Sequence, residues 1–370
     1  MVPFAGYEMP VTYNDPSSIT KEHMAVREAA GIFDVSHMGR MMVTGPDALK
    51  FLNLLVPRDL SKTVVGRVAY TYMLNEQAGF RDDLTVARMD ENDYLVTWNA
   101  GNYRKIWHWV NMFGNILKTA ADWTFEVEDI TPKTAMIAFQ GPKAPALIEK
   151  LFGTFPGSWQ IAHAEYKGAK VIIMGSGYTG EDGGEITVLE TSADTPKNAL
   201  AVWEGILEDC KDEGVIPCGL GARDTLRTEA GMPLYGNDIT EGISPVEAGL
   251  AFPPLVSLAK PFFVGKDLLA QFMDNPDSRG RRVGLLATQK GRAPRPGMKL
   301  FINDEEIGWV SSGVSSPLLK VGVGFGYVKS SVAVGTAVEA RQDGSKKAIP
   351  LTVADFPLYD PDKYGKKRKQ

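Results

Sequence analysis

The sequence predicts an α+β protein of two or three domains, the last of which is all β. With 370 residues, the chain is longer than one ordinary hydrophobic core can serve. Up to about residue 274, strand-like stretches mix with helical stretches whose apolar residues recur every three or four positions. Beyond a polar stretch rich in proline and glycine at 275–280, only strand-like stretches remain. This change of pattern predicts a domain boundary.

The composition is that of a soluble globular protein, and it argues against several classes of partner. Apolar residues make up 44% and charged residues 23%, and a net charge of −5 gives no support for nucleic-acid binding. No uncharged apolar run is long enough to span a bilayer, and the start lacks the order of a signal peptide. Cys210 and Cys218 do not make a disulfide framework, so a reducing, cytoplasmic setting is expected. The four histidines lack metal-ligand spacing, so no metal is predicted.

Apolar periodicity predicts the elements before the boundary. Residues 1–16 predict an ordered loop, and the stretch 67–99 predicts an antiparallel meander with turns rich in asparagine, aspartate and glycine. Both cysteines are expected in the core rather than as nucleophiles. Helices are predicted at 19–30, from Gly45 onward, at 102–117, after Pro142 and at 196–211. Strands are predicted at 31–40, 68–74, 84–89, 94–98, 125–130, 135–139, 170–174 and 185–189.

The C-terminal part predicts a small barrel or Greek-key domain. Turns such as Asp343-Gly344 separate its strand-like stretches. The basic run at 366–369 is interpreted as a solvated C-terminus. The predicted strands run over 283–287, 298–302, 307–310, 321–328, 337–341 and 349–353.

The stretch 177–185 is a glycine-rich, acidic loop between two predicted strands. It holds four glycines and three carboxylates in nine residues. Glycine tolerates positive φ and lets a ligand approach the main chain closely. Two interpretations remain open from spacing alone: a solvated acidic turn, or a ligand loop in which one carboxylate binds a flat group that carries hydrogen-bond donors.

Two further charged stretches add candidate site residues. Asp82 and Asp83 stand at a predicted strand start, and adjacent side chains on a strand face opposite ways. Arg223 and Arg227 share one face of a predicted helix, where Asp224 and Glu229 could neutralise them or an anionic group could meet them. No glycine-rich phosphate loop follows a strand in the Rossmann or P-loop manner. These residue types favour proton handling or charge stabilisation rather than covalent catalysis.

Eight motifs follow one another along nearly the whole chain, at 2–10, 33–38, 82–84, 139–142, 177–183, 219–224, 234–238 and 312–317. Their series resembles the glycine cleavage system T-protein (aminomethyltransferase) family. The resemblance implies a cloverleaf of three domains around a central hole that binds tetrahydrofolate, with the first two domains discontinuous in sequence. The domains it implies are 1–45 with 129–218, 46–128 with 219–274, and 279–370.

The resemblance also implies a reaction and a set of site residues. An aminomethyl group on the lipoyl arm of a carrier protein, the glycine cleavage H-protein, would lose ammonia while its carbon passes to tetrahydrofolate, the co-substrate. Asp83 matches the catalytic aspartate, which would stabilise positive charge as the C–N bond breaks. Glu185 matches the glutamate that accepts two hydrogen bonds from the pterin edge. The remaining positions at or beside the implied folate site are Tyr70, Asn99, Tyr178, Arg227, Phe252 and Arg295.

Four departures from the family pattern keep other functions open. The family usually has tryptophan where Tyr7 and Phe252 stand, arginine where Gly175 stands, and an aliphatic residue where Arg81 stands. A demethylase that takes a methyl group from a small sulfonium, ammonium or ether donor is the first alternative. A folate-binding protein without transferase activity is the second. No nucleic-acid or membrane partner is expected.

Overall fold

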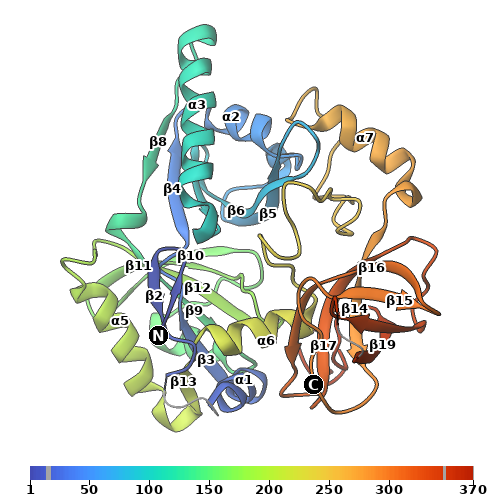
Figure 1. The fold of residues 1–370 in the computed structure, drawn as a ribbon. Helices are drawn as coiled ribbons and strands as arrows, with labels where there is room; N and C mark the ends of the chain where they lie inside the picture. Colours follow the sequence, from blue (N-terminus) through green and yellow to red (C-terminus); the bar gives the residue numbers. More distant parts are fainter. Residues whose placement is uncertain (14–17, 345–346, 370) are drawn as a thin grey trace.

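The fold combines two open sheets with a closed barrel, as Figure 1 shows. The computed structural model describes residues 1–13, 18–344 and 347–369. In these ranges the strands form a two-stranded hairpin, a six-stranded sheet, a five-stranded sheet and a six-stranded barrel. The predicted α+β class is confirmed, and so is the all-β C-terminal part.

The six-stranded sheet has the order β10-β11-β12-β9-β3-β13. Its neighbouring strands pair antiparallel, apart from the parallel pair β13 and β3. Helices α4 and α5 pack on one apolar cluster of this sheet, whereas α1 and α6 pack against each other beside a second cluster. The strands are β3 (Ala30–Asp34), β9 (Ala135–Gln140), β10 (Ile161–Tyr166), β11 (Ala169–Met174), β12 (Gly183–Val188) and β13 (Val215–Pro217). The helices are α1 (Ser18–Glu28), α4 (Ala144–Phe152), α5 (Lys197–Asp209) and α6 (Leu220–Ala230).

The five-stranded sheet has the order β5-β6-β7-β4-β8 and is antiparallel throughout. The predicted meander at 67–99 is confirmed as β5, β6 and β7. Helices α2 and α3 share its apolar core. The elements are β4 (Gly39–Thr44), α2 (Ala48–Leu55), β5 (Arg67–Leu74), β6 (Phe80–Asp90), β7 (Asp93–Trp98), α3 (Tyr103–Ala121) and β8 (Glu126–Asp129).

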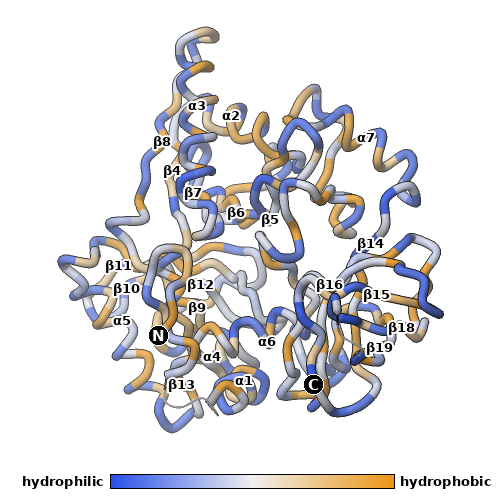
Figure 2. Tube along the Cα trace, viewed as in Figure 1, coloured by the Kyte–Doolittle hydropathy of each residue, from blue (hydrophilic) through white to orange (hydrophobic). Residues whose placement is uncertain are grey.

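The barrel closes in the order β14-β17-β16-β15-β18-β19. Its interior is apolar, and Figure 2 shows hydrophobic residues along its strands and those of the sheets, with hydrophilic residues in many outer turns. The strands are β14 (Arg281–Ala287), β15 (Lys299–Ile302), β16 (Glu305–Ser315), β17 (Gly322–Val328), β18 (Ala337–Arg341) and β19 (Ala348–Ala354).

The structure differs from the sequence-based expectation in several places. The one strand predicted at 31–40 is two strands of different sheets, β3 and β4, and strands β10 and β13 were not predicted. The first residues form a hairpin, β1 (Val2–Phe4) with β2 (Tyr7–Met9), where a loop was expected. Helix α7 (Lys266–Asp274) was not predicted, and β6 begins at Phe80 rather than after the aspartates. Short 3-10 helices lie at Leu60–Lys62, Ala100–Asn102, Thr131–Lys133, Lys211–Glu213 and Pro276–Ser278.

Two further observations concern the described residues as a whole. Both cysteines are buried and free, which confirms their assignment to the core. Within 1–13, 18–344 and 347–369, no helix is long and apolar enough to cross a membrane, and no cluster of three potential metal ligands occurs. The domain boundaries given above stay a prediction.

Candidate functional site

Two neighbouring carboxylates of β6 meet one amide. Asn99 directly follows β7, the strand paired with β6. Its Nδ2 donates to Oδ1 of Asp82 at 2.9 Å and to Oδ1 of Asp83 at 2.8 Å, and its backbone N–H donates to Oδ2 of Asp82 at 3.1 Å. The Tyr70 hydroxyl, from β5, donates to Oδ2 of Asp83 at 3.0 Å. The structure thus brings together three predicted residues, Tyr70, Asp83 and Asn99.

Neutral donors, not cations, hold this carboxylate pair. Among the described residues, no ion pair reaches Asp82 or Asp83. Burial raises the pKa of Asp83 to about 6, although the hydrogen bonds from Tyr70 and Asn99 act in the opposite direction. Burial and the charge of Asp83 raise the pKa of Asp82 as well. Asp82 is buried and Asp83 is half-buried. The charge of Asp83 would be stabilised by a cation that forms beside it.

Tyr178 joins this pair to helix α6. It lies in the loop between β11 and β12, and its hydroxyl donates to the Pro233 carbonyl at 2.6 Å. Burial raises the pKa of the Tyr178 hydroxyl above its usual value, and the charge of Asp83 adds to that rise. The guanidinium of Arg223, on α6, lies 4.8 Å from the centroid of the Tyr178 ring. Tyr178 therefore lies near both the Asp83 carboxylate and the Arg223 guanidinium.

Arg223 has an open donor and was missed as a site residue. Its Nη1 atom is buried and has no hydrogen-bond partner in the structure. Burial lowers the pKa of Arg223, while the nearby charges of Glu185 and Tyr178 oppose that shift. A buried donor without a partner costs free energy, so an acceptor on a ligand would be favourable here. The i, i+4 spacing indicates Arg223 and Arg227 equally, but the family resemblance places only Arg227 at the folate site.

Arg227 uses its donors within the protein. Its guanidinium donates to Asp224 at 2.8 Å and to Asp238 at 2.6 Å, and Nη2 donates to the Ser312 hydroxyl of β16 at 3.0 Å. The side chain is buried. These contacts join α6 to the loop after it and to the barrel. A folate contact by Arg227 stays a prediction, and Arg223 is the guanidinium with a free donor.

Glu185 lies on β12 at the end of the glycine-rich loop. The pairing of β11 with β12 confirms that the stretch 177–185 leads from one strand to the next. The Glu185 carboxylate is half-buried and accepts a hydrogen bond from the Ser176 hydroxyl. That bond fixes one oxygen and leaves acceptor capacity for a second group.

Glu181, in the same loop, serves the fold. It is fully buried, and its Oε1 accepts from Arg27 of α1 at 2.9 Å and from the Gly365 backbone N–H at 3.0 Å. The interpretation of this loop as a solvated turn is therefore wrong for Glu181. The expected solvated C-terminus is also wrong at Arg368, whose guanidinium pairs with Glu181. The C-terminal run packs against the loop because a buried carboxylate needs cationic partners.

Phe252 and Arg295 lie at more open positions. Phe252 is 49% exposed, and Arg295 is exposed, with its Nη1 donating to the Gly313 carbonyl at 3.3 Å. In the part of the chain that the structure describes, neither side chain forms a hydrogen bond or ion pair with the other six predicted site residues. Their assignment to the folate site stays a prediction.

Two departures from the family pattern have a structural reason. The register of β5 and β6 shifts beside Arg81, which turns its side chain so that the guanidinium stacks 3.7 Å from the centroid of the Trp109 ring on α3. Arg81 therefore does not pair with Asp83. At Gly175, an added Cβ would lie 1.7 Å from the Gly157 carbonyl oxygen, so the backbone leaves no space for an arginine.

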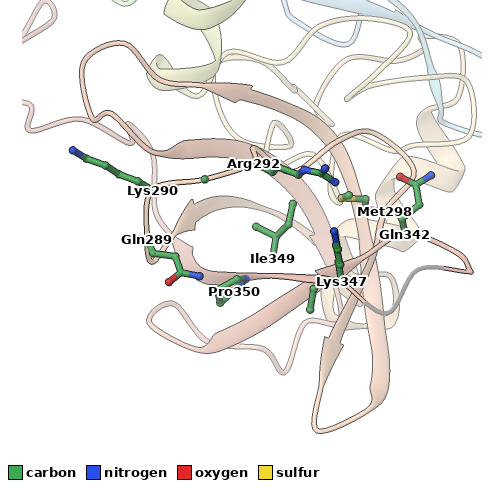
Figure 3. A pocket seen from close by; sticks show the side chains of 10 residues that line it. Gln289, Lys290, Arg292, Met298, Gln342, Lys347, Ile349 and Pro350 are labelled. Atoms are coloured by element: carbon green, nitrogen blue, oxygen red, sulfur yellow. The ribbon is translucent and has the colours of Figure 1, made fainter.

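A cavity of about 420 Å³ lies in the barrel domain (Figure 3). Lys290, Arg292 and Lys347 lie around it, and Ile349 and Pro350 line its wall. None of the eight predicted site residues lines this cavity.

The fold and the site together define a class of protein. The chain is an α+β protein with a closed barrel, and its site offers a buried carboxylate, aromatic hydroxyls and an open guanidinium donor in place of a nucleophile. Such a site stabilises charge on a bound molecule.

Comparisons with known proteins name the family. Residues 1–260 match the GCVT N-terminal domain, and residues 281–360 match the glycine cleavage T-protein C-terminal barrel domain. The chain is 41% identical to an aminomethyltransferase of Geobacillus thermodenitrificans over 97% of this chain and 94% of that protein. It is 40% identical to a probable aminomethyltransferase of Pyrococcus horikoshii, over 98% and 94% of the two chains.

A solved structure agrees with these relatives. The glycine cleavage system aminomethyltransferase T from Bartonella henselae superposes with a TM-score of 0.84 at 33% identity, over 99% of this chain and 95% of that one. The chain belongs to the glycine cleavage T-protein family. It is thus a one-carbon transferase of the aminomethyltransferase type.

Proposed function

We propose that this protein transfers a one-carbon unit from an aminomethyl-lipoyl carrier protein to tetrahydrofolate and releases ammonia. The observation that carries the proposal is the Asp83 carboxylate, which is half-buried, has its pKa raised by desolvation, and is held by neutral donors from Tyr70 and Asn99. A carboxylate in that state stabilises a positive charge that develops beside it more strongly than one already paired with a cation.

The residues present fit a folate. The ring N–H and amino group of a pterin form an edge with two donors, and the Glu185 carboxylate, half-buried on β12, can accept from such an edge. The unpartnered Nη1 of Arg223 suits a pterin carbonyl oxygen beside that edge. The Tyr178 ring would supply a flat apolar surface next to both groups.

In the proposed mechanism, Asp83 stabilises the charge that forms when the carbon–nitrogen bond breaks. The bond between the aminomethyl carbon and its nitrogen breaks as ammonia leaves, and positive charge develops at the carbon. Ionised Asp83 stabilises that charge, while Tyr70 and Asn99 hold its two oxygens in place. Two amine nitrogens of the folate each lose a proton and bond to the carbon, in place of its bonds to the amino nitrogen and to the sulfur, and the two protons leave with the ammonia and the thiol. The dihydrolipoyl sulfur is released as a thiol, so no oxidant or reductant is needed.

The partner and co-substrate form part of the same proposal. The donor is the lipoyl arm of the glycine cleavage H-protein, and Arg295, which is exposed on the barrel, is proposed to meet the anionic tail of the folate or the opening for the arm. Phe252 is proposed to pack at the same opening. No metal is required by this scheme.

A two-arm assay of the purified protein tests the reaction. One arm offers aminomethylated H-protein with tetrahydrofolate, and the other offers small sulfonium, ammonium and ether methyl donors with the same folate. We expect ammonia and methylenetetrahydrofolate in the first arm alone. Methyltetrahydrofolate in the second arm would establish the demethylase alternative, and no turnover in either arm would favour a binding protein without transferase activity.

Calorimetry with tetrahydrofolate tests the pterin contact separately. Glu185→Ala is expected to weaken binding at least tenfold, about 1.4 kcal/mol, because a charge-assisted bidentate contact is lost. The matched control is Glu190→Ala, which removes an exposed carboxylate shortly after the same strand. Equal affinity in the two variants would exclude Glu185 as the pterin contact.

A further inference from the structure

Gln140 is the buried residue around which the glycine-rich loop is built. It ends β9, between β3 and β12, where it is paired with Gly31 on one side and Gly183 on the other. Its side chain has no solvent exposure. A buried amide must satisfy its donors and acceptor within the protein, and Gln140 does so with residues of the loop.

The amide of Gln140 bonds both arms of the loop. Its Nε2 donates to the Ser176 carbonyl at 3.1 Å and to the Gly184 carbonyl at 3.2 Å. Its Oε1 accepts from the Thr179 hydroxyl at 3.1 Å. The same Thr179 oxygen accepts from the Glu181 backbone N–H at 3.2 Å. One side chain thus connects the entry, the turn and the exit of the loop.

The glycines of the loop leave the space that Gln140 fills. A Cβ on Gly177 would lie 1.7 Å from Oε1 of Gln140. At Gly183, where φ is +143°, a Cβ would lie 2.2 Å from the Phe139 carbonyl oxygen and 3.0 Å from Nε2 of Gln140. Two glycines therefore allow the backbone to fold closely around this one amide.

The hydrogen bonds of Gln140 involve two residues that adjoin Glu185, the proposed pterin contact. Ser176, whose carbonyl accepts from Gln140, donates its own hydroxyl to the Glu185 carboxylate. Gly184, whose carbonyl also accepts from Gln140, immediately precedes Glu185 in the chain. Movement of either residue would turn the carboxylate of Glu185 away from its present direction.

We infer that Gln140 is a positioning residue for the folate site, which it serves by fixing the direction of the Glu185 carboxylate through Ser176 and Gly184. The inference rests on the proposed function, since it assigns Gln140 to the same ligand as Glu185. Gln140 itself touches only protein groups, and its effect on the ligand passes through Glu185.

The test separates this role from general stabilisation of the fold. Gln140→Met keeps the volume of the side chain and removes its hydrogen bonds. We expect the Kd for tetrahydrofolate to rise about tenfold in an otherwise unchanged protein, and at most about twofold when Glu185→Ala is already present, because residues that act through one another are not additive. The KM for folate should rise while kcat changes little.

Thr187→Val is the matched control. It removes a buried hydroxyl from β12, two residues beyond Glu185, where the Oγ1 atom has no hydrogen-bond partner. This variant should leave the Kd unchanged. The same rise in Kd for Gln140→Met with and without Glu185→Ala, or no rise at all, would overturn the inference alone. No effect of Glu185→Ala by itself would overturn the proposed pterin contact and the inference together.

Discussion

The molecule holds two groups of acidic side chains that are buried or half-buried, and the partners of the two groups differ. On β6, Asp82 and Asp83 meet an amide and a phenol hydroxyl. Glu181, in the glycine-rich loop, and Glu229, on α6, meet the guanidinium of Arg27 at 2.9 Å and 3.0 Å. All three of those side chains are fully buried.

The pKa values of Asp83, from the first group, and Glu229, from the second, move in opposite directions. Burial raises the pKa of Asp83 to about 6. Burial acts in the same way on Glu229, yet the hydrogen bond from His23 and the charges of His23 and Arg27 hold the Glu229 pKa below its usual value. The difference lies in the presence of cations, since desolvation acts to raise the pKa of both Asp83 and Glu229.

This contrast separates the structural acids from Asp83, the acid proposed to be catalytic. Glu181 and Glu229 join α1, α6, the loop, the barrel through Ser316 and the C-terminal run through Arg368. Their charges are already neutralised by the protein. The charge of Asp83 has no such partner within the described residues, so it remains available to a cation that forms during a reaction.

The largest effect is expected when the structural group loses its cation. Arg27→Ala would leave Glu181 and Glu229 buried without their shared partner, which typically costs about 3–5 kcal/mol of unfolding free energy. Chemical denaturation with urea measures the loss. Lys170→Ala, which breaks the exposed pair with Glu190 at 3.3 Å, is the control and should cost about 1 kcal/mol or less. Similar losses in the two variants would contradict the role assigned to Arg27.

The next effect concerns catalysis rather than stability. Asp83→Asn keeps the shape of the side chain and removes its charge, so kcat is expected to fall about 100-fold or more, as for other charge-stabilising groups. Tetrahydrofolate binding should remain largely intact. Steady-state kinetics with aminomethylated H-protein and calorimetry with folate measure the two quantities. Unchanged turnover would remove Asp83 from its catalytic role.

The raised pKa of Asp83 predicts a pH dependence. Because the ionised form is required, kcat should fall about tenfold per pH unit below about pH 6. The raised pKa also affects stability. Between pH 3.8, the ordinary pKa of the group, and about pH 6, Asp83 is protonated in the folded protein but ionised in the unfolded chain. The free energy of unfolding therefore falls as the pH rises through that window. Glu229 acts oppositely: its contribution to stability is lost as the pH falls through its lowered pKa. A pH profile of kcat without an acid limb would contradict this assignment.

Much of the fold could be predicted because its signals are local. The barrel strands β14 to β19 and the meander follow from period 2 and from turn residues that lie within a few positions of each other. Of the site, Asp83 and Glu185 were named through resemblance. Spacing alone gave a loop and an acidic strand start without saying that either belongs to a site.

The rest depends on contacts between distant residues. Arg27 and Glu181 are 154 positions apart in the sequence, and Gln140 and Thr179 are 39 positions apart. No local sequence pattern can predict contacts over such separations. The helical spacing of Arg223 and Arg227 could not say which guanidinium would be neutralised, because Asp238 and Ser312 come from other segments. The direction of Arg81 depends on a register shift between two strands, which periodicity does not reveal.

The smallest effect is expected from substitution of Arg81. This substitution tests whether a cation close to Asp83 in the sequence changes the pKa of Asp83. Arg81 stands two residues before Asp83, yet its guanidinium stacks on Trp109, 3.7 Å from the ring centroid. Arg81→Leu should therefore change kcat by less than about twofold and leave the acid limb near pH 6 in place, while the lost cation–π contact costs about 1 kcal/mol of stability. A shift of that limb by one pH unit would show that the charge of Arg81 reaches Asp83 in solution. Asp83 would then resemble Glu229, with a cation close enough to lower its pKa.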